Sequence, residues 1–155
     1  MVHSPFTISL ATTADAHRLH QGCYPQQPWR IFEEQFQRSL RRQTADLSRY
    51  LLAQTAEGAI IGTAQLHRYS SCAEIADVYV AEAWRGRGLG TQLIRHLEQL
   101  AHELGWFPLE IGVEESNGRA LALYQRLGYT LDRPLRLPST PLALILRKEA
   151  SQLVS

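Results

Sequence analysis

An apolar, strand-like run leads through a glycine-rich turn into a long amphipathic helix, and this succession most restricts the possible folds. Residues 75–80 are rich in β-branched and aromatic side chains, which is typical of a strand. The apolar positions that follow recur at helical spacing, and Gly105 provides a stop: Leu89, Leu93, Ile94, Leu97, Leu100, Ala101 and Leu104. A helix with one wide apolar face needs a sheet to cover, so the segment predicts a layered α/β architecture.

Further strands and helices are expected on both sides of this unit. Strand-like runs occupy residues 6–10, 50–54, 59–66, 109–113, 129–131 and 142–147, and the second and third of these read as a hairpin. Three more helices are expected, the first starting at a Thr12/Asp15 capping box, the second carrying Trp29, Phe32, Phe36 and Leu40, and the last following Asn117 and ending at Gly128. The order predicts an α/β (α+β) fold with a mixed, mostly antiparallel central sheet flanked by about four helices.

Length and composition indicate an ordinary globular protein. The 155 residues fit a single domain over residues 1–155, and 45% hydrophobic with 20% charged residues exclude disordered and fibrous classes. The formal net charge of +1 gives no general attraction for nucleic acid or for an anionic membrane. A small arginine cluster, Arg38, Arg41, Arg42 and Arg49, is explained by a solvated helix face.

Cysteine usage and the N-terminal segment point to a cytoplasmic protein. Cys23 and Cys72 form no CxxC unit and have no histidine at metal-ligand spacing, so neither a disulfide framework nor a metal site is expected. The first residues lack a basic region followed by an apolar core, and no stretch approaches the roughly 20 apolar residues of a membrane span.

The turn between strand and helix suits a diphosphate. It reads Arg85, Gly86, Arg87, Gly88, Leu89, Gly90. A helix N-terminus offers unpaired backbone N–H groups and a positive dipole end, glycine lets an anion approach the backbone, and the arginines add charge-assisted contacts. The alternative interpretation is a structural turn with solvated arginines.

Two common nucleotide motifs fit the turn poorly. Counting from Gly86, the dinucleotide fingerprint requires a third glycine where Thr91 stands. The phosphate loop of ATP- and GTP-binding proteins requires a lysine followed by serine or threonine, and residues 85–90 contain no lysine.

In these residues the sequence resembles the GNAT superfamily of N-acetyltransferases, whose cofactor signature is Q/R-x-x-G-x-G/A. Residues 85–90 fit that signature, and a second block at Asn117, Ala120, Leu123, Tyr124, Gly128 and Tyr129 matches the family's later helical motif. The resemblance implies acetyl-CoA as co-substrate, without a metal, and transfer of an acetyl group to an amine. It also implies that the fourth and fifth strands splay apart around the cofactor, helped by a bulge in the fourth strand.

The resemblance also assigns roles to individual residues. It implies that backbone groups of Val78, Tyr79 and Val80 contact the pantetheine arm and the thioester, and that the N–H groups of residues 85–90 bind the pyrophosphate. Asn117 is expected to contact the cofactor, although its type also suits a helix N-cap. Tyr124 is expected to lie at the cofactor and to protonate the leaving thiolate, although a core aromatic would show the same pattern.

Two acids on the fourth strand compete for the role of general base. Glu74 has a spacing from the signature similar to that of the catalytic glutamate in the histone-acetylating branch, and Asp77 a spacing similar to that of an acid that binds cationic substrate in polyamine-acetylating members. In an unbulged strand the two would point to opposite faces, so one of them would reach the acceptor. A solvated or salt-bridged strand acid is the competing interpretation of each, and His67, Tyr69 and Cys72 are weaker candidates.

The function expected from these observations is transfer of an acetyl group from acetyl-CoA to a primary amine of a small molecule or a protein, by direct attack in a ternary complex. The alternative is a non-catalytic acyl-CoA-binding sensor of the same ancestry. The acceptor itself is left open. Trp29, Phe32 and Phe36 suggest an apolar or aromatic wall, although any amphipathic helix shows the same spacing. Family habit makes a homodimer an expectation, whereas no interface is visible in the sequence.

Overall fold

One seven-stranded sheet runs through the molecule in the order β1-β2-β3-β4-β5-β7-β6. We describe residues 4–152 from a computed structural model. The strands are β1 (Phe6–Leu10), β2 (Ser48–Thr55), β3 (Ile60–Arg68), β4 (Ala73–Val80), β5 (Leu109–Glu114), β6 (Thr130–Leu135) and β7 (Ala143–Lys148). The β4–β5 pair is parallel and the other neighbouring pairs are antiparallel. The mixed, mostly antiparallel sheet expected from the sequence is therefore confirmed.

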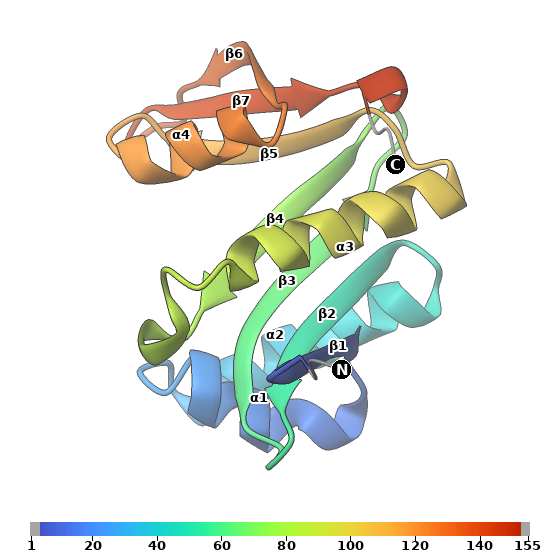
Figure 1. Cartoon of the computed structure of the whole chain (residues 1–155), viewed down its shortest axis with the longest axis vertical. Helices are drawn as coiled ribbons and strands as arrows, with labels where there is room; N and C mark the ends of the chain where they lie inside the picture. The colour runs from blue at the N-terminus through green and yellow to red at the C-terminus, as the bar shows by residue number, and fades with distance from the viewer. Residues whose placement is uncertain (1–3, 153–155) are drawn as a thin grey trace.

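Helices cover both faces of the sheet (Figure 1). They are α1 (Ala16–Cys23), α2 (Trp29–Thr44), α3 (Leu89–Leu104) and α4 (Gly118–Arg126), with short 3₁₀ turns η1 (Thr13–Asp15), η2 (Glu82–Trp84) and η3 (Ala150–Gln152). On one face α1 and α2 bury Leu19, Phe32 and Phe36 against β2 and β3. On the other face α3 buries its apolar stripe, and α4 packs beside it.

The helix boundaries follow the signals in the sequence. Just before η1 and α1, the Thr12 backbone N–H donates a hydrogen bond to Asp15 Oδ2 at 2.7 Å, as in a capping box. Gly105 ends α3 in a left-handed conformation with φ 71°. The Asn117 side chain caps α4 by accepting a hydrogen bond from the Ala120 N–H at 3.1 Å. The capping expectations for these three helices are confirmed. They could be made from the sequence because a cap depends on residues that are close together in the chain.

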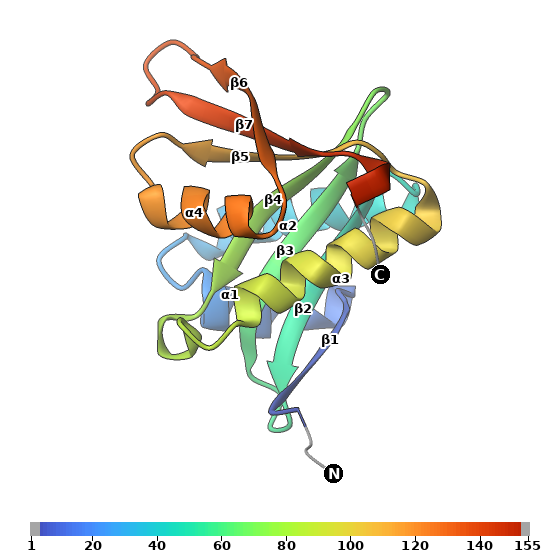
Figure 2. The same cartoon turned by 45° about the horizontal axis from the view of Figure 1, so that its top comes forward.

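Strand β4 carries a bulge, and it separates from β5 near the middle of its length. The β3–β4 register shifts between Thr63 and Gln65, and Asp77 at the bulge has φ 53°. Parallel pairing with β5 is confined to residues 73–75 opposite 109–111. Beyond that point the ribbons of β4 and β5 diverge toward α4 and η2 (Figure 2). The expected splay and bulge are both present.

One expectation about the late loop is wrong. The strand-like runs at residues 129–131 and 142–147 left Pro134 in the loop between them, but β6 continues through Pro134 to Leu135. Because β6 is the outermost strand and pairs with β7 alone, a residue without an N–H costs no hydrogen bond on its free edge.

Buried charges join α3 to the last strand. Glu98 of α3 is 6% exposed, and Lys148 of β7 is 4% exposed. The Lys148 ammonium donates to Glu98 Oε2 at 2.9 Å and to the Leu127 carbonyl at 2.7 Å, and the Tyr129 hydroxyl donates to the same Glu98 oxygen at 2.8 Å. This group ties the end of α4 to α3. Within residues 4–152, no helix has the length and apolar character needed to cross a bilayer.

Candidate active site

The turn between β4 and α3 presents a row of unused backbone donors. Over residues 4–152, no backbone N–H from Gly86 to Thr91 donates a hydrogen bond to a protein acceptor, and the first helical bond here runs from the Gln92 N–H to the Gly88 carbonyl at 3.0 Å. These N–H groups lie at the positive end of the α3 dipole. The turn therefore has the donors that a diphosphate requires.

Two glycines of the turn are required by its backbone conformation. Gly86 has φ 76° and Gly88 has φ 83°, a region that other residues rarely adopt. A Cβ added at either position would meet nothing within 4 Å, so the space beside the turn is open. Gly90 has no such φ, and a Cβ there would meet Val80 Cγ2 at 3.7 Å.

The two arginines of the turn do different things. Arg85 donates from Nε to the Val80 carbonyl at 2.9 Å, and its guanidinium lies 5.5 Å from the centre of the Tyr79 ring. Arg87 lies 5.1 Å from the centre of the Trp84 ring and is exposed. Arg85 thus braces the turn against β4, whereas the cation of Arg87 is available to an anion.

Backbone groups of β4 face the region where β5 has diverged. The Ala81 N–H donates to the Ile61 carbonyl at 2.8 Å. Since strand residues alternate in the direction of their hydrogen-bonding groups, Val80 directs its N–H and C=O away from β3. Arg85 takes the carbonyl, which leaves the N–H as a donor aimed at the splayed side.

Helix α4 carries the two other predicted cofactor residues. The Asn117 side chain is engaged as the N-cap of α4, as its type suggested. Tyr124 is half-buried and packs against the same apolar cluster as Val78 and Val80. Burial raises the pKa of the Tyr124 hydroxyl, so that group stays protonated at neutral pH.

A cavity of about 960 Å³ lies on the opposite face of β4, between the sheet and the α1–α2 segment. Its lining combines aromatic, amide and charged side chains: Cys23, Tyr24, Pro25, Gln26, Gln27, Phe32, Gln35, Phe36, Arg38, Ser39, Tyr50, Gln65, Asp77, Tyr79 and Glu82. Phe32 and Phe36, two of the three expected wall residues, line it, whereas Trp29 stacks on His17 at 4.2 Å between ring centroids.

The bulge brings both candidate acids to the same face of the sheet. Glu74 stands opposite His67, and Asp77 accepts a hydrogen bond from Gln65 Nε2 at 3.1 Å. His67 and Gln65 share a face of β3 because they are two residues apart. The opposite-face arrangement foreseen for an unbulged strand therefore does not apply. Asp77 lines the cavity, and Glu74 lies outside its lining.

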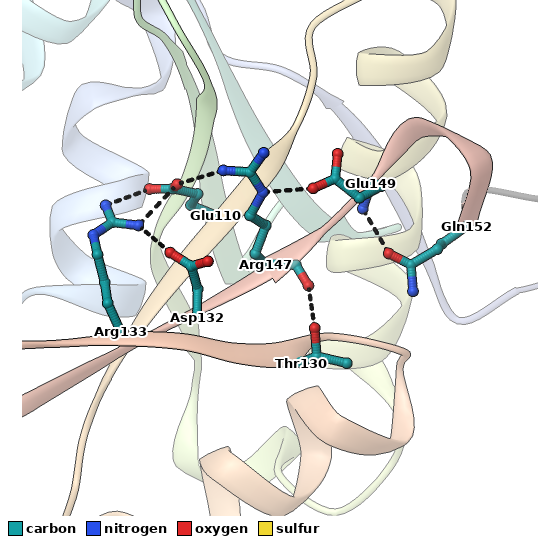
Figure 3. Close-up of polar contacts among 7 residues, drawn as sticks. All are labelled: Glu110, Thr130, Asp132, Arg133, Arg147, Glu149 and Gln152. Atoms are coloured by element: carbon teal, nitrogen blue, oxygen red, sulfur yellow. Dashed lines mark hydrogen bonds and ion pairs between the residues drawn. The ribbon is translucent and has the colours of Figure 1, made fainter.

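Glu74 is surrounded by other carboxylates. Burial raises its pKa, and the negative charges of Asp77 and Glu110 raise it further. Glu110 stands beside Glu74 on β5. The guanidinium of Arg133, on β6, donates two hydrogen bonds to the Glu110 carboxylate, at 3.0 and 3.1 Å (Figure 3). Arg133 offsets part of the Glu110 charge, so burial, the largest cause, and the charge of Asp77 remain as the main reasons why Glu74 is more basic than a free carboxylate.

The weaker candidates lie elsewhere. A second cavity, of about 560 Å³, is lined by Tyr69 and Cys72 together with Arg68 and Trp106, at the end of β4 far from the glycine turn. His67 lines neither cavity, and burial followed by the charge of Arg42 lowers its pKa. Among residues 4–152 no group of three or more His, Cys, Asp or Glu is placed to hold a metal ion.

Sequence reasoning missed three cavity residues. Tyr24, Tyr50 and Gln65 border the same space as Asp77. Burial raises the pKa of both tyrosines, and the charge of Asp77 adds to the effect. Tyr24 lies in a loop with no periodicity to place it. Gln65 carried a usable signal, since a polar side chain inside an apolar strand run points to a polar site on one face.

A profile of the acetyltransferase (GNAT) family matches residues 13–129, a range that contains the glycine turn, both acids and Tyr124. The chain belongs to this family. The match spans every element from η1 to α4 and ends at Tyr129, the residue before β6. The resemblance inferred from the two motifs is thereby confirmed.

Curated relatives of this GNAT chain are similar over shorter stretches. It is 35% identical over 54 residues to thialysine N-ε-acetyltransferase from Bos taurus, which covers 35% of this chain and 32% of that protein. It is 35% identical over 85 residues to streptothricin acetyltransferase from Streptomyces lavendulae, covering 53% of this chain and 44% of the relative. The chain thus matches less than half the length of these relatives.

Solved structures share the fold of this GNAT chain over nearly its whole length. A spermidine N-acetyltransferase chimera from Vibrio cholerae and hSSAT superposes with a TM-score of 0.81 at 17% identity, covering 97% of this chain and 98% of that one. The ribosomal-protein-S18-alanine N-acetyltransferase from Escherichia coli gives a TM-score of 0.75 at 24% identity, covering 94% of each chain. At these identities the likeness concerns the fold.

Proposed function

We propose that this GNAT chain transfers an acetyl group from acetyl-CoA to a primary amine of a small molecule or a protein. The observation that carries the proposal is the row of unused N–H groups from Gly86 to Thr91, beside the point where β4 and β5 have separated. A carboxylate-bearing cavity opens on the far face of the same strand. The two features supply one site for a diphosphate and another for an amine.

Acetyl-CoA, when bound, supplies an activated acyl group as a thioester. In the proposed arrangement the turn holds its diphosphate through residues 86–91 and Arg87, and Asn117 borders the arm of the cofactor. The backbone N–H of Val80 faces the splayed side of β4 and is placed to stabilise negative charge on a carbonyl oxygen. Val78 and Tyr79 contribute backbone contacts of the same kind.

We assign binding of the amine to one side chain and proton transfer to two. Asp77 binds the amine of the acceptor, since its carboxylate lines the cavity. Glu74 accepts the proton of the amine directly or through water, an assignment supported by its raised pKa and its position on the same face. Tyr124 donates a proton to the departing sulfur, which requires the protonated hydroxyl that burial favours.

The relatives support the choice of an amine as the acceptor. The names of the relatives, thialysine, streptothricin and spermidine acetyltransferases, refer to amines, in keeping with an amine acceptor here. We further propose one GNAT domain over residues 1–155, a cytoplasmic location and a homodimer, with neither nucleic acid nor membrane as a partner.

Release of free thiol tests the proposal. Purified protein is incubated with acetyl-CoA and a panel of amines that includes amino acids, diamines and polyamines, and the CoA thiol is measured with a chromogenic reagent. We expect amine-dependent release and saturable heat on titration with CoA. Binding of CoA without turnover on any amine would instead support the acyl-CoA sensor, and absence of CoA binding would refute both functions.

A further inference from the structure

The cavity beside β4 is electrically polarised. Its sheet wall contains the Asp77 carboxylate, with Glu82 nearby at the start of η2. Its helical wall, on α2, contains the donors Gln35, Arg38 and Ser39. Arg38 is the basic residue of the lining, so the positive and negative ends of the cavity belong to different elements of the fold.

The α2 wall is built as a set of donors that point the same way. Gln35, Arg38 and Ser39 are three and four residues apart and therefore share a helix face. The Gln35 oxygen accepts from Gln27 at 2.9 Å, which leaves its NH₂ group free to donate. Within residues 4–152, Arg38 has neither an ion pair nor a hydrogen bond to a protein acceptor, in contrast to Arg30 on the same helix, which pairs with Glu34.

The sheet wall has the complementary character. Asp77 forms no ion pair in the described part of the chain, and its one protein hydrogen bond comes from the neutral Gln65 amide. The negative charge of Asp77 reaches the hydroxyls of Tyr24 and Tyr50, whose pKa values it raises in addition to the effect of burial. An ammonium group would relieve this uncompensated charge.

Aromatic side chains separate the two ends. Tyr24 and Phe32 lie 5.7 Å apart between ring centroids, and Phe36 and Tyr50 lie 5.4 Å apart. All four line the cavity. Their rings form an apolar surface for the hydrocarbon part of a ligand, between the Asp77 carboxylate and the Arg38 guanidinium. The cavity volume of about 960 Å³ is large enough for a small molecule.

We propose that the acceptor is an amine that also carries a carboxylate, as in an amino acid, with its amine directed to Asp77 and its carboxylate bound by Arg38. This inference rests on the proposed acetyltransferase function and specifies its substrate class. An amine without an anionic group would leave Arg38 unmatched, and a polycation would meet it as a like charge. The donors Gln35 and Ser39 fit the second carboxylate oxygen.

Matched pairs of acceptors that differ in the carboxylate alone test the inference. Phenylalanine is compared with phenethylamine, and lysine with 1,5-diaminopentane, by CoA release at saturating acetyl-CoA. We expect kcat/KM to be about 10- to 100-fold higher for the amino acid of the better pair, the effect of one hydrogen-bonded charge pair. Arg38→Gln should remove this preference by lowering kcat/KM for the amino acid, and it should not lower kcat/KM for the decarboxylated amine. Arg38→Lys should retain part of the preference.

Arg41→Gln is the matched control, since Arg41 is exposed on the same helix and lies outside the cavity lining. Equal or higher kcat/KM for the decarboxylated amines, or an equal loss for both members of a pair in Arg38→Gln, would overturn the inference while leaving acetyl transfer intact. If no amine is acetylated, calorimetry on the CoA-saturated protein still decides the substrate class: phenylalanine must bind more tightly than phenethylamine, and Arg38→Gln must abolish the difference.

Discussion

Gln65 Nε2 donates a hydrogen bond to Asp77 Oδ2 at 3.1 Å, directly across the bulge of β4. Gln65 is 6% exposed, so its amide is fixed within the sheet, and Asp77 holds φ 53° in the adjoining strand. The pair holds the Asp77 carboxylate on the cavity face without neutralising it.

Asp77→Asn should lower kcat/KM for amine acceptors by about 10- to 100-fold and leave CoA affinity unchanged, since the charge that attracts the amine is lost while the turn is intact. Asparagine tolerates the left-handed backbone at this position. Asp46→Asn is the control, because Asp46 also has positive φ, 60°, but lies outside this cavity. Unaltered kinetics in Asp77→Asn would remove Asp77 from acceptor binding.

Tyr124→Phe should reduce kcat by about 100-fold with little change in CoA affinity, because a proton donor to the leaving thiolate acts in the transition state. Steady-state kinetics and calorimetry with CoA separate the two quantities. Tyr69→Phe, at a tyrosine that is 50% exposed, provides the control. A wild-type kcat in Tyr124→Phe would leave the tyrosine with a packing role alone.

Glu74→Gln should depress the rate most at pH values above the pKa of Glu74, where the wild-type carboxylate is deprotonated and able to act as a base. In the wild-type protein the acid limb of the kcat/KM profile should lie above the usual glutamate pKa, since burial and the charges of Asp77 and Glu110 raise the pKa of Glu74. An identical pH profile in the variant would shift the role of base to Asp77 or to water.

Glu74→Gln should lower the rate but raise stability relative to the wild-type protein as pH increases. Because the folded-state pKa of Glu74 is raised, wild-type stability falls as pH rises from the unfolded glutamate value through the folded one. Glutamine does not titrate. The free energy of unfolding of Glu74→Gln, minus that of the wild-type protein, should therefore increase between the unfolded-state and folded-state pKa values of Glu74. Urea denaturation at a series of pH values measures both free energies of unfolding, and a difference, variant minus wild type, that decreases with rising pH would contradict the raised pKa.

Gly88→Ala should weaken CoA binding beyond its effect on stability. At φ 83° alanine costs about 1 kcal/mol, and its methyl group would project into the open space beside the turn. Gly105→Ala is a matched control, because Gly105 has φ 71° at the other end of α3 and equally open surroundings. Both variants should lose similar stability in urea, and Gly88→Ala alone should lose CoA affinity. Equal affinities would place the diphosphate elsewhere.

Lys148→Met should destabilise the fold by about 1–3 kcal/mol, because it removes the buried cation of Glu98 and the donor to the Leu127 carbonyl. It leaves Arg95, at 2.9 Å, as the remaining cation beside the carboxylate. Urea denaturation gives the free energy of unfolding. The double change Glu98→Met with Lys148→Met should cost less than the single change, since no buried charge then stays unpaired. A loss below about 1 kcal/mol in the single variant would show that Arg95 and water compensate the Glu98 charge without Lys148.

The sequence by itself determined the elements and the turn. The helix that begins at Leu89 and ends before Gly105 could be predicted because its apolar stripe and its left-handed stop are local properties. The caps at Thr12 and Asn117 follow equally local rules. The donors of residues 86–91 were predictable for the same reason, since any helix leaves its first N–H groups unpaired.

Tertiary structure alone decided how the candidate acids are placed and what surrounds them. The bulge at Asp77 reverses the alternation of β4, so strand spacing could not show that Glu74 and Asp77 share a face. The cavity joins Arg38 of α2 to Asp77 of β4, and Arg133 reaches Glu110 from the last hairpin. These relationships join residues far apart in the chain, and packing and strand register, which have no local signal, bring them together.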